Sequence, residues 1–587
     1  MIKWTRYGLL MPVLLVQALS SCSLIDEPEY EESDSVMASL AFTVSGVQNS
    51  STRMVDDVVQ NNLKRQPSSL YVVAMQDDKP KKSSIIWNAP VSKEGVGEQP
   101  ASLLYHSHYC AMASGVNHCL VYGDVADVVS GNKPPKVYNG SLIKSSFNFV
   151  TSQSDLRNIS FYLESIYDQE TPEEATLLAT AMTNVANLTD WVGSDNDILK
   201  NLRQNFLNHG FNLPGSAASV KKWLESLASA AQIYINNPSG LTESDKTILG
   251  TIKTKADEIV TEIGTISATS YPRNRYLPDG AAALRWVESA SKFQPEMQTT
   301  TLDNINTVSR FAYPAALYYF VDSPIRTSDE KVDFEAIYNT VNTTADKTAW
   351  EEVLSSGNFN HSPVTANTKS IALVEPVQYA VAQLHVTLKA SPTVENGTTI
   401  KDDADDDIDI VTTNESGTTN NFQLTGVIVC GQRPVNYLFE QDTNSDANVK
   451  FIYDSQVKEN CYLSTGKTEN ACRTLVLQSF DGEDVNIILE FEYNGNQKFK
   501  CVDGYVYPGT RFYLVGKVDH SNPSSGDDAI NRGRVFTKDY ITTVNMVVTS
   551  LAKAYNVLPN LLTSNLEIGV QTNPEWIAVT PTVIRME

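Results

Sequence analysis

The histidines and cysteines between residues 106 and 119 are the first candidates for chemistry, because these side chains bind transition metals. His106, His108 and Cys110 alternate along the chain, so on a β-strand they share one face. His118 and Cys119 follow a Ser-Gly turn, but as sequence neighbours they point to opposite faces of a strand. We therefore expect no metal site here. In an oxidising compartment, a Cys110–Cys119 disulfide is the alternative.

Two acidic stretches are the other candidates for metal binding. Residues 402–409 (DDADDDID) are the densest run of charge, but they lack the DxDxDG order of a calcium-binding loop. Asp442–Asp446 comes closer to that order, yet Ala447 stands where the loop needs its glycine. We interpret both stretches as solvated loops and expect the protein to need no cofactor.

Motifs of catalysis are absent from the chain. It contains no GxSxG elbow, no HExxH zinc helix, no glycine-rich phosphate loop and no CxxC pair. None of its seven histidines stands in the setting of a nucleophilic triad. We expect the protein not to be an enzyme.

Covalent processing is predicted at the N-terminus. Lys3 and Arg6 precede an apolar run over 7–19, which has the length of a secretory signal and is too short to span a membrane. The run leads into Leu-Ser-Ser-Cys, the pattern of a bacterial lipoprotein signal, so we expect residues 1–21 to be removed and Cys22 to be lipidated. An ordinary secretory signal is the alternative. An acidic, solvated tether follows over 26–34.

Composition limits the class of partner. The chain has 45 Lys and Arg residues against 69 Asp and Glu residues, a net charge of −24, which argues against nucleic acid as a partner. Apolar residues make up 41% of the chain and aromatic residues 9%, which is enough for packed cores. A length of 587 residues exceeds one hydrophobic core and suggests about two to four domains.

Strand patterns dominate both ends of the chain. Apolar residues alternate with polar or small ones, or form short apolar runs, over 36–47, 70–75, 384–388, 424–430, 510–518 and 566–585. Turns at Ser114-Gly115 and Asp481-Gly482 predict two hairpins, over 103–122 and 474–493. Many short strands separated by turns favour β-sandwiches.

A helical stretch interrupts the strands over about 171–265. Thr171, Pro172 and Glu174 form a helix-start pattern, and apolar residues then recur at helical spacing. We expect helices over 171–191, 197–207, 216–235 and 242–263.

Short motifs of the second half occur in an order and spacing typical of one family. They are YPAALYY (313–319), SPIRTS (323–328), EPVQYAVAQL (375–384), YPG (507–509), FYLVGK (512–517), VFTKDY (535–540), AYNVLPN (554–560) and LEIGV (566–570). The first half matches more loosely at TRM (52–54), VYG (121–123) and GSAASV (215–220). Through these motifs, most of residues 36–587 resembles the fimbrillins of Bacteroidales-type fimbriae, which are pilus subunits exported as lipoproteins.

The resemblance implies a mainly β chain of two tandem transthyretin-like β-sandwich domains, the first carrying the helical insertion. It places a lipoprotein signal at 1–21, a propeptide with the acidic tether and first strand at 22–53, the N-terminal domain at 54–365 and the C-terminal domain at 366–587. It also implies cleavage by a trypsin-like protease. Arg53 is the expected processing residue, and Lys64 and Arg65 are the nearest alternatives.

According to the resemblance, loss of the first strand opens a groove, and a C-terminal strand of a neighbouring subunit fills it. Residues 566–587 alternate well enough to be that donor strand. We therefore expect a fimbrial subunit at the outer membrane and cell surface that supports adhesion. Its expected partners are other fimbrial subunits, the processing protease and a ligand on a host or bacterial surface, with the outer membrane as partner of the lipid anchor before processing.

Two alternatives stay open. In the first alternative, the chain is a tip or anchor subunit, whose C-terminal strand pairs within its own chain and whose helical insertion binds a ligand. Otherwise it is a monomeric surface glycan-binding lipoprotein, which exposed aromatic side chains gathered on one loop face would favour.

Overall fold

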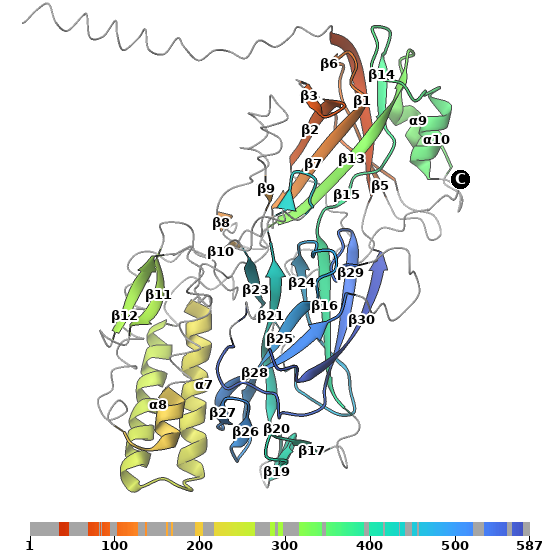
Figure 1. Cartoon of the computed structure of the whole chain (residues 1–587). Helices are drawn as coiled ribbons and strands as arrows, with labels where there is room; N and C mark the ends of the chain where they lie inside the picture. The colour runs from red at the N-terminus through yellow and green to blue at the C-terminus, as the bar shows by residue number, and fades with distance from the viewer. Residues whose placement is uncertain are drawn as a thin grey trace, which may run out of the picture.

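The computed structural model describes residues 35–45, 69–81, 83, 85–93, 102–126, 136–137, 160–161, 166–167, 194–203, 217–263, 282–287, 292–297, 316–342, 348–391, 398–414, 417–433, 435–440, 449–454, 457–458, 460–520, 533–559, 561 and 566–578. Two bodies, each built around its own sheet, lie one after the other along the molecule (Figure 1). The mainly β fold class is confirmed, while the transthyretin-like kind of sandwich stays a prediction. Among the described helices, none is long and apolar enough to cross a membrane.

The first sheet has ten strands. Its order is β3-β2-β7-β13-β14-β1-β5-β4, with β15 paired to β13 and β6 paired to β1. The strands are β1 (Ser35–Ser45), β2 (Ser69–Gln76), β3 (Lys79–Lys81), β4 (Val91–Lys93), β5 (Ser102–His106), β6 (Cys110–Ala113), β7 (His118–Ala126), β13 (Ala316–Ser328), β14 (Ser370–Leu373) and β15 (Gln378–Tyr379).

Strand β13 joins the two layers of this first body. Residues 316–324 pair antiparallel with β7, and residues 325–328 pair with β14. The strand therefore passes from the layer that contains β2 and β7 into the layer that contains β14, β1 and β5. Apolar side chains of both layers, such as Val121 and Leu40, are buried in one core.

The second sheet has eight strands in the order β23-β21-β25-β28-β30-β29-β16-β24. They are β16 (Ala382–Ala390), β21 (Phe422–Gln432), β23 (Lys450–Asp454), β24 (Glu469–Val476), β25 (Val485–Tyr493), β28 (Thr510–Val518), β29 (Tyr540–Val548) and β30 (Val570–Ala578). Short two-stranded pairs are β8 (Lys136–Val137) with β10 (Ile166–Tyr167), β9 (Ser160–Phe161) with β22 (Val435–Asn436), β11 (Ala282–Val287) with β12 (Lys292–Met297), β17 (Thr399–Lys401) with β18 (Asp407–Asp409), β19 (Val411–Asn414) with β20 (Gly417–Asn420), and β26 (Phe499–Cys501) with β27 (Gly504–Val506).

The second sheet folds over between β28 and β30. These strands share one parallel pair, Gly516 with Val570, whereas β28 pairs along its length with β25 and β30 pairs along its length with β29. Leu489 from one half and Val386 from the other are buried in the same cluster. The second body is therefore built on one eight-stranded sheet whose two halves meet at a single residue pair.

Two long helices occupy the predicted insertion. α7 (Ala217–Asn236) and α8 (Glu243–Ile263) confirm the helices expected over 216–235 and 242–263. Residues 197–203 are also helical, and the first expected helix, over 171–191, lies outside the described residues.

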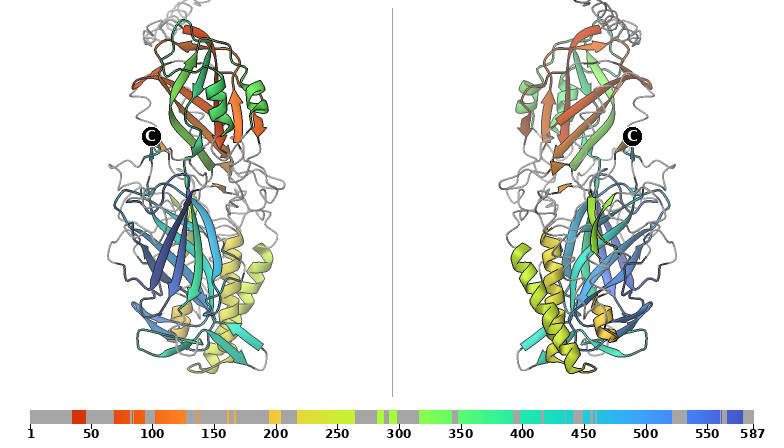
Figure 2. Two further views of the ribbon diagram at one scale, coloured as in Figure 1. Left: turned by 90° about the vertical axis from the view of Figure 1, so that its right-hand side faces the viewer. Right: turned by 90° about the vertical axis from the view of Figure 1, so that its left-hand side faces the viewer.

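The helical insertion packs on the second body, although it interrupts the first body in the sequence. Ser226 Oγ of α7 donates to Glu492 Oε2 of β25 at 2.6 Å. A Cβ on Gly509 would lie 2.1 Å from the Cβ of Ala230, so helix and sheet touch closely there. Both views of Figure 2 show α7 and α8 beside the second sheet. The expectation that the insertion decorates the first domain is therefore right in chain order only.

A buried ion pair adjoins the contact between α7 and the sheet. Arg511 Nη1 lies 3.1 Å from Glu490 Oε1, and the Glu490 side chain is fully buried. Thr425 Oγ1 also donates to Glu490 Oε1 at 2.7 Å. Because a buried carboxylate needs such partners, these bonds tie β21, β25 and β28 together under α7.

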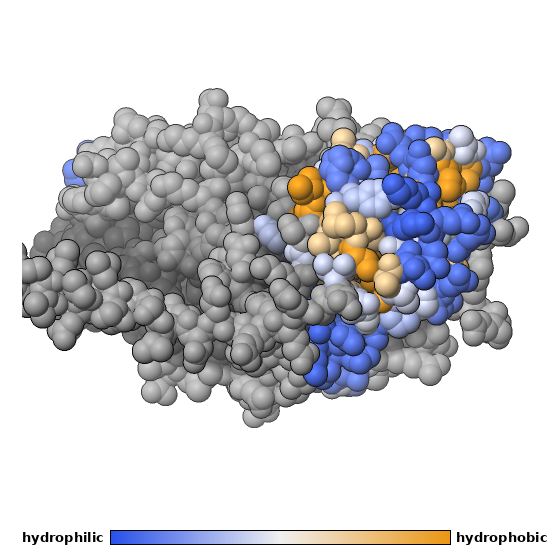
Figure 3. Space-filling model, turned by 90° about the horizontal axis from the view of Figure 1, so that it is seen from above, coloured by the Kyte–Doolittle hydropathy of each residue, from blue (hydrophilic) through white to orange (hydrophobic). Residues whose placement is uncertain are grey.

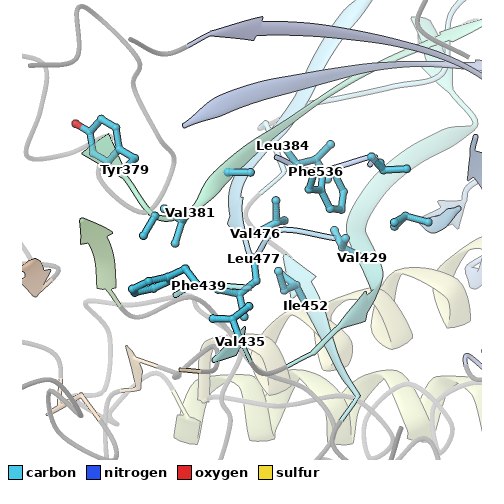
Figure 4. Close-up of a cluster of buried hydrophobic side chains, with 14 of the residues drawn as sticks. Tyr379, Val381, Leu384, Val429, Val435, Phe439, Ile452, Val476, Leu477 and Phe536 are labelled. Carbon is cyan, nitrogen blue, oxygen red and sulfur yellow. The ribbon is translucent and has the colours of Figure 1, made fainter. Parts of the chain in front are cut away.

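The two bodies share a packed junction. Tyr122 OH of the first body donates to the carbonyl oxygen of Tyr437 at 2.7 Å, and the ring of Phe320 lies 5.4 Å from that of Phe439. Figure 4 shows Tyr379 of β15 and Phe439 in one cluster with core residues of the second sheet. β14 and β15 pair in the first sheet, so the second sheet begins at β16, later than the expected boundary at residue 366.

The two predicted hairpins are wrong. Both turns form, and Gly115 and Gly482 adopt φ values of 86° and 78°. However, β6 pairs with β1 and β7 pairs with β2 and β13, while β24 pairs with β16 and β25 pairs with β21 and β28. Each turn connects strands that pair with more distant segments. Alternation of apolar residues indicates a strand and does not indicate its partner.

Candidate functional site around strand β1

Strand β1 is buried on the face that points into the first body. Ala38, Leu40, Phe42 and Val44 alternate along the strand, and each is at most 1% exposed. The Phe42 ring stacks on Tyr105 at 5.6 Å and meets the edge of Trp87 at 5.2 Å. The period-two pattern of the sequence predicted this face, because successive side chains of a strand point to opposite sides.

The opposite face of β1 is covered by two short helices. α9 (Phe334–Thr340) and α10 (Ala349–Ser356) contribute side chains to one apolar cluster with Ala41 of β1, Leu104 of β5 and Ala372 of β14. Ser39 and Thr43, which flank Ala41 on this face, are also buried. β1 is therefore a central strand covered on both sides.

Sequence analysis missed α9 and α10. A signal was present, because Thr348 and Glu351 form a Thr-x-x-Glu capping box at the start of α10. At α9, the Asp333 side chain accepts a hydrogen bond from the backbone N–H of Ala336. The N-cap residues of both helices were therefore readable from the sequence.

Backbone bonds hold β1 on both edges. It pairs antiparallel with β5 over Ala41–Ser45 and parallel with β14 over Ser39–Ala41. Its first residues pair with β6, and the Cys110 thiol donates to the carbonyl oxygen of Ala38 at 3.3 Å. Among the described strands, no other strand lies between β14 and β5.

The C-terminal strand is paired within its own chain. β30 bonds to β29 over nine residue pairs, from Tyr540 with Ala578 to Val548 with Val570. Val570 is buried in the second body. This is the arrangement that the tip or anchor alternative expects, and it is also the arrangement of a donor strand before release.

The predicted processing residues lie outside the described part of the chain. Cys22, Arg53, Lys64 and Arg65 are all in this group, so lipidation and cleavage at these positions stay predictions. The segment between the end of β1 and the start of β2, residues 46–68, contains the three basic residues.

The histidines of residues 106–119 have different partners in the structure. His106 bonds to Asn88 and lies 3.6 Å from Glu335, whereas His118 lies 3.9 Å from Asp322. The six described cysteines are buried free thiols, among them both members of the Cys110–Cys119 pair. Burial raises the pKa of Cys119 to about 12, so this thiol stays protonated and unreactive.

The acidic run over 402–409 is folded around Asp402. One carboxylate oxygen accepts the backbone N–H groups of Ala404 and Asp406, at 2.8 and 2.9 Å, and the other accepts the N–H of Lys500 at 2.7 Å. The remaining aspartates are exposed as expected, but the stretch is a loop only in part, because Asp407–Asp409 form β18 and pair with β17. The second acidic stretch, 442–446, lies outside the described residues.

A cluster that the sequence did not reveal combines Asp484, Asp519 and His520, whose ligand atoms lie within 4.8 Å of one another. Asp484 already pairs with the Lys517 ammonium at 2.6 Å and with His520 Nδ1 at 2.7 Å. Burial acts to raise the pKa of Asp484, but the hydrogen bonds from Lys517 and His520 outweigh it and lower the pKa to about 2. We interpret the cluster as an ion-pair network.

Comparison with known proteins gives neighbours in structure only. No family model matches the chain, and no curated protein matches its sequence. A candidate cell adhesion protein from Parabacteroides distasonis aligns with 93% of this chain and 100% of its own, at 7% identity and a TM-score of 0.32. A candidate cell adhesion protein from Bacteroides eggerthii aligns with 92% of this chain and 96% of its own, at 8% identity and a TM-score of 0.31.

A fimbrilin from Porphyromonas gingivalis also aligns, over 36% of this chain and 60% of its own, at 12% identity and a TM-score of 0.19. At these identities and scores, the matches describe neighbours and do not assign the chain to a family.

Proposed function

We propose that the chain is an exported fimbrial subunit that assembles by exchanging its first strand for a strand of a neighbouring subunit. The observation that carries the proposal is the place of β1. It is the first described strand, it lies at the centre of a sheet, and residues 46–68 separate it from the rest of the described chain. One cut in that segment would allow the buried strand β1 to leave. Its departure would open a groove between β14 and β5, which we call the β1 seat.

The proposed route begins with export and lipidation at Cys22 and continues with a cut after Arg53. The cut separates β1 from the body, and a C-terminal strand of another subunit then occupies the seat. Strand addition of this kind gains backbone hydrogen bonds along both edges, and the alternating side chains fix the register. The assembled subunits would form a fibre that supports adhesion at the cell surface.

A tip or anchor subunit is the second candidate, and the pairing of β30 with β29 agrees with it. A strand that bonds to β29 over nine residue pairs must leave the second body before it can serve as a donor. A subunit at one end of a fibre accepts a strand without donating its own. The two roles therefore differ in whether β30 is released.

The exposed aromatic side chains give no support to the glycan-binding alternative, whereas the closed first body, with β1 in place, agrees with it. Of the described tyrosines, Tyr109 and Tyr505 are the exposed ones, and they belong to different bodies. Figure 3, which looks at the molecule from above, shows small apolar patches scattered among polar residues on the described part of that face. Sugar-binding sites usually stack the ring on aromatic side chains, and no such platform appears among the described residues.

Limited proteolysis tests the proposal. The chain starting at Ser23 is treated with trypsin in limiting amount, the new N-terminus is identified by mass spectrometry, and the product is separated by size. A cut between β1 and β2 followed by a ladder of multimers is the expected result, and Arg53→Gln is the matched control for the site. A clean cut without multimers would favour the tip or anchor role. Resistance of the whole segment would contradict the proposal.

A further inference from the structure

We propose that α9 and α10 form a brace across the β1 seat. The brace holds β5 and β14 one strand apart after β1 has left. It also limits the size of the side chains on any strand that enters. This inference rests on the proposed function. It explains how the empty groove stays open, and it states which strand the groove accepts.

The groove needs support because, among the described strands, β1 alone connects β14 with β5 in this layer. β5 pairs with β1 and β4, β6 pairs with β1, and β14 pairs with β1 and β13. Without β1, the described backbone pairing leaves β4 and β5 bonded to each other and separated from β14. The backbone N–H and C=O groups that β1 leaves on β5 and β14 would then be unpaired. Because unpaired strand edges favour new hydrogen bonds, the groove would close.

One end of the brace is fixed to the β4–β5 side. Lys93 Nζ of β4 donates to the carbonyl oxygens of Tyr338, at 2.6 Å, and of Val341, at the C-terminal end of α9. Ser102 Oγ of β5 shares a hydrogen bond of 2.5 Å with Tyr338 OH. Burial raises the pKa of Tyr338 to about 12, with the bond to Ser102 acting in the opposite direction, so the phenol stays protonated.

The other end of the brace is fixed to β14. Trp350 Nε1 of α10 donates to the carbonyl oxygen of Leu373 at 2.9 Å, in a buried position. The segment that leads into α9 adds a second attachment, because the backbone N–H of Val332 donates to Ser370 Oγ at 2.9 Å. Neither attachment involves an atom of β1.

The two helices are also fixed to each other. The rings of Phe334 in α9 and Trp350 in α10 stack at 6.4 Å, and Phe359, just after α10, stacks on Phe334 at 5.8 Å. The brace therefore runs from β4 and β5 through α9 and α10 to β14, and its contacts persist when β1 is absent.

The same geometry limits what can enter. On the face of β1 that meets the helices, Ser39, Ala41 and Thr43 are all small, and Ala41 is fully buried. The face toward the core carries Leu40 and Phe42. The seat thus accepts a strand that is large on one face and small on the other. In the C-terminal sequence from the end of β30 onward, the small Ala578, Thr580 and Thr582 alternate with Ile577, Val579 and Val583, and Pro581 interrupts the larger set because it has no N–H to donate to a neighbouring strand.

Peptide exchange tests the size limit. A site for a specific protease is placed between β1 and β2 in the full chain, the protein is cut, and a fluorescent peptide of residues 35–45 is added in excess. The Ala41→Leu peptide should bind about tenfold more weakly or worse, since extra methylenes in a packed site are costly. The Met37→Leu peptide is the control, because Met37 is 57% exposed in the strand. Equal binding of all three peptides would overturn the size limit.

Variants of the brace test its role in the empty seat. Trp350→Phe and Lys93→Met each remove one attachment, and Ser355→Ala, on an exposed position of α10, is the control. In the cut protein freed of β1, each brace variant should lose hydrogen-exchange protection in β5 and bind the peptide about three- to tenfold more weakly. An effect on thermal stability of the uncut protein with unchanged peptide affinity would overturn the brace.

The outcomes separate this inference from the proposed function. If the cut wild-type protein never exchanges β1 for the peptide, the proposed function fails and the brace fails with it. If the wild type exchanges and the brace variants behave in the same way as Ser355→Ala, the brace alone fails.

Discussion

Replacing Phe42 with alanine tests whether β1 supports the first body only until the chain is processed. Phe42 is fully buried, and its ring contacts those of Tyr105 and Trp87. Truncation of a buried phenylalanine costs about 3–5 kcal/mol, because the lost transfer free energy adds to the cost of a cavity. That is a large share of the total stability of a domain, which is about 5–15 kcal/mol.

Urea denaturation of the uncut chain, followed by tryptophan fluorescence, measures this loss. We expect Phe42→Ala to lower the free energy of unfolding of the first body by about 4 kcal/mol. Met37→Ala is the matched control on the same strand, and it should stay within about 0.5 kcal/mol of the wild type because Met37 is 57% exposed.

The same variant then reports on processing. After a cut between β1 and β2 and exchange of the strand, the difference between Phe42→Ala and wild type should disappear, because the substituted strand is gone. A difference that persists after the cut would mean that β1 stays in its seat, and the strand-exchange reasoning would be refuted. A loss below about 1 kcal/mol in the uncut chain would refute the packing argument itself.

Three further predictions concern the second body. Arg511→Ala should lower its stability by about 3–5 kcal/mol in chemical denaturation, since it leaves the Glu490 carboxylate buried without its cation; a loss below 1 kcal/mol would contradict this. Gly509→Ala should detach α7, because the added methyl meets Ala230 and the φ of 77° disfavours a side chain, and combination with Ala230→Gly should restore much of the helix protection in hydrogen exchange. The pKa of Asp484 is lowered to about 2, so its charged form should stabilise the folded protein above the ordinary aspartate range, and this stabilisation should be lost as the pH falls from about 4 to about 2. Asp484→Asn should flatten that part of the curve of stability against pH. An unchanged curve would count against the ion-pair network.

The sequence located elements better than it located their partners. β1, β2, β16, β21 and β28 all lie where alternating or apolar runs predicted strands. Periodicity is a property of neighbouring residues, so it survives without knowledge of the fold. The two expected hairpins failed for the converse reason, since pairing is decided by segments far away in the chain.

The candidate site shows the same division. The alternation of Leu40 and Phe42 with Ala41 marked β1 as a strand with one large and one small face. It did not reveal that the small face lies under α9 and α10, because the residues of those helices follow about 300 positions later. The capping box at Thr348 indicates the start of α10 and does not indicate which strands α10 covers.

By itself, the sequence determined the mainly β class, the positions of α7 and α8, and the two-faced character of β1, because these depend on local side-chain spacing and backbone preference. Only the tertiary structure decided that β1 lies centrally between β14 and β5, that the inserted helices pack on the second body, and that β30 pairs with β29 in its own chain. These arrangements follow from the burial of apolar faces against distant segments. That burial is a property of the whole chain, and no local pattern encodes it.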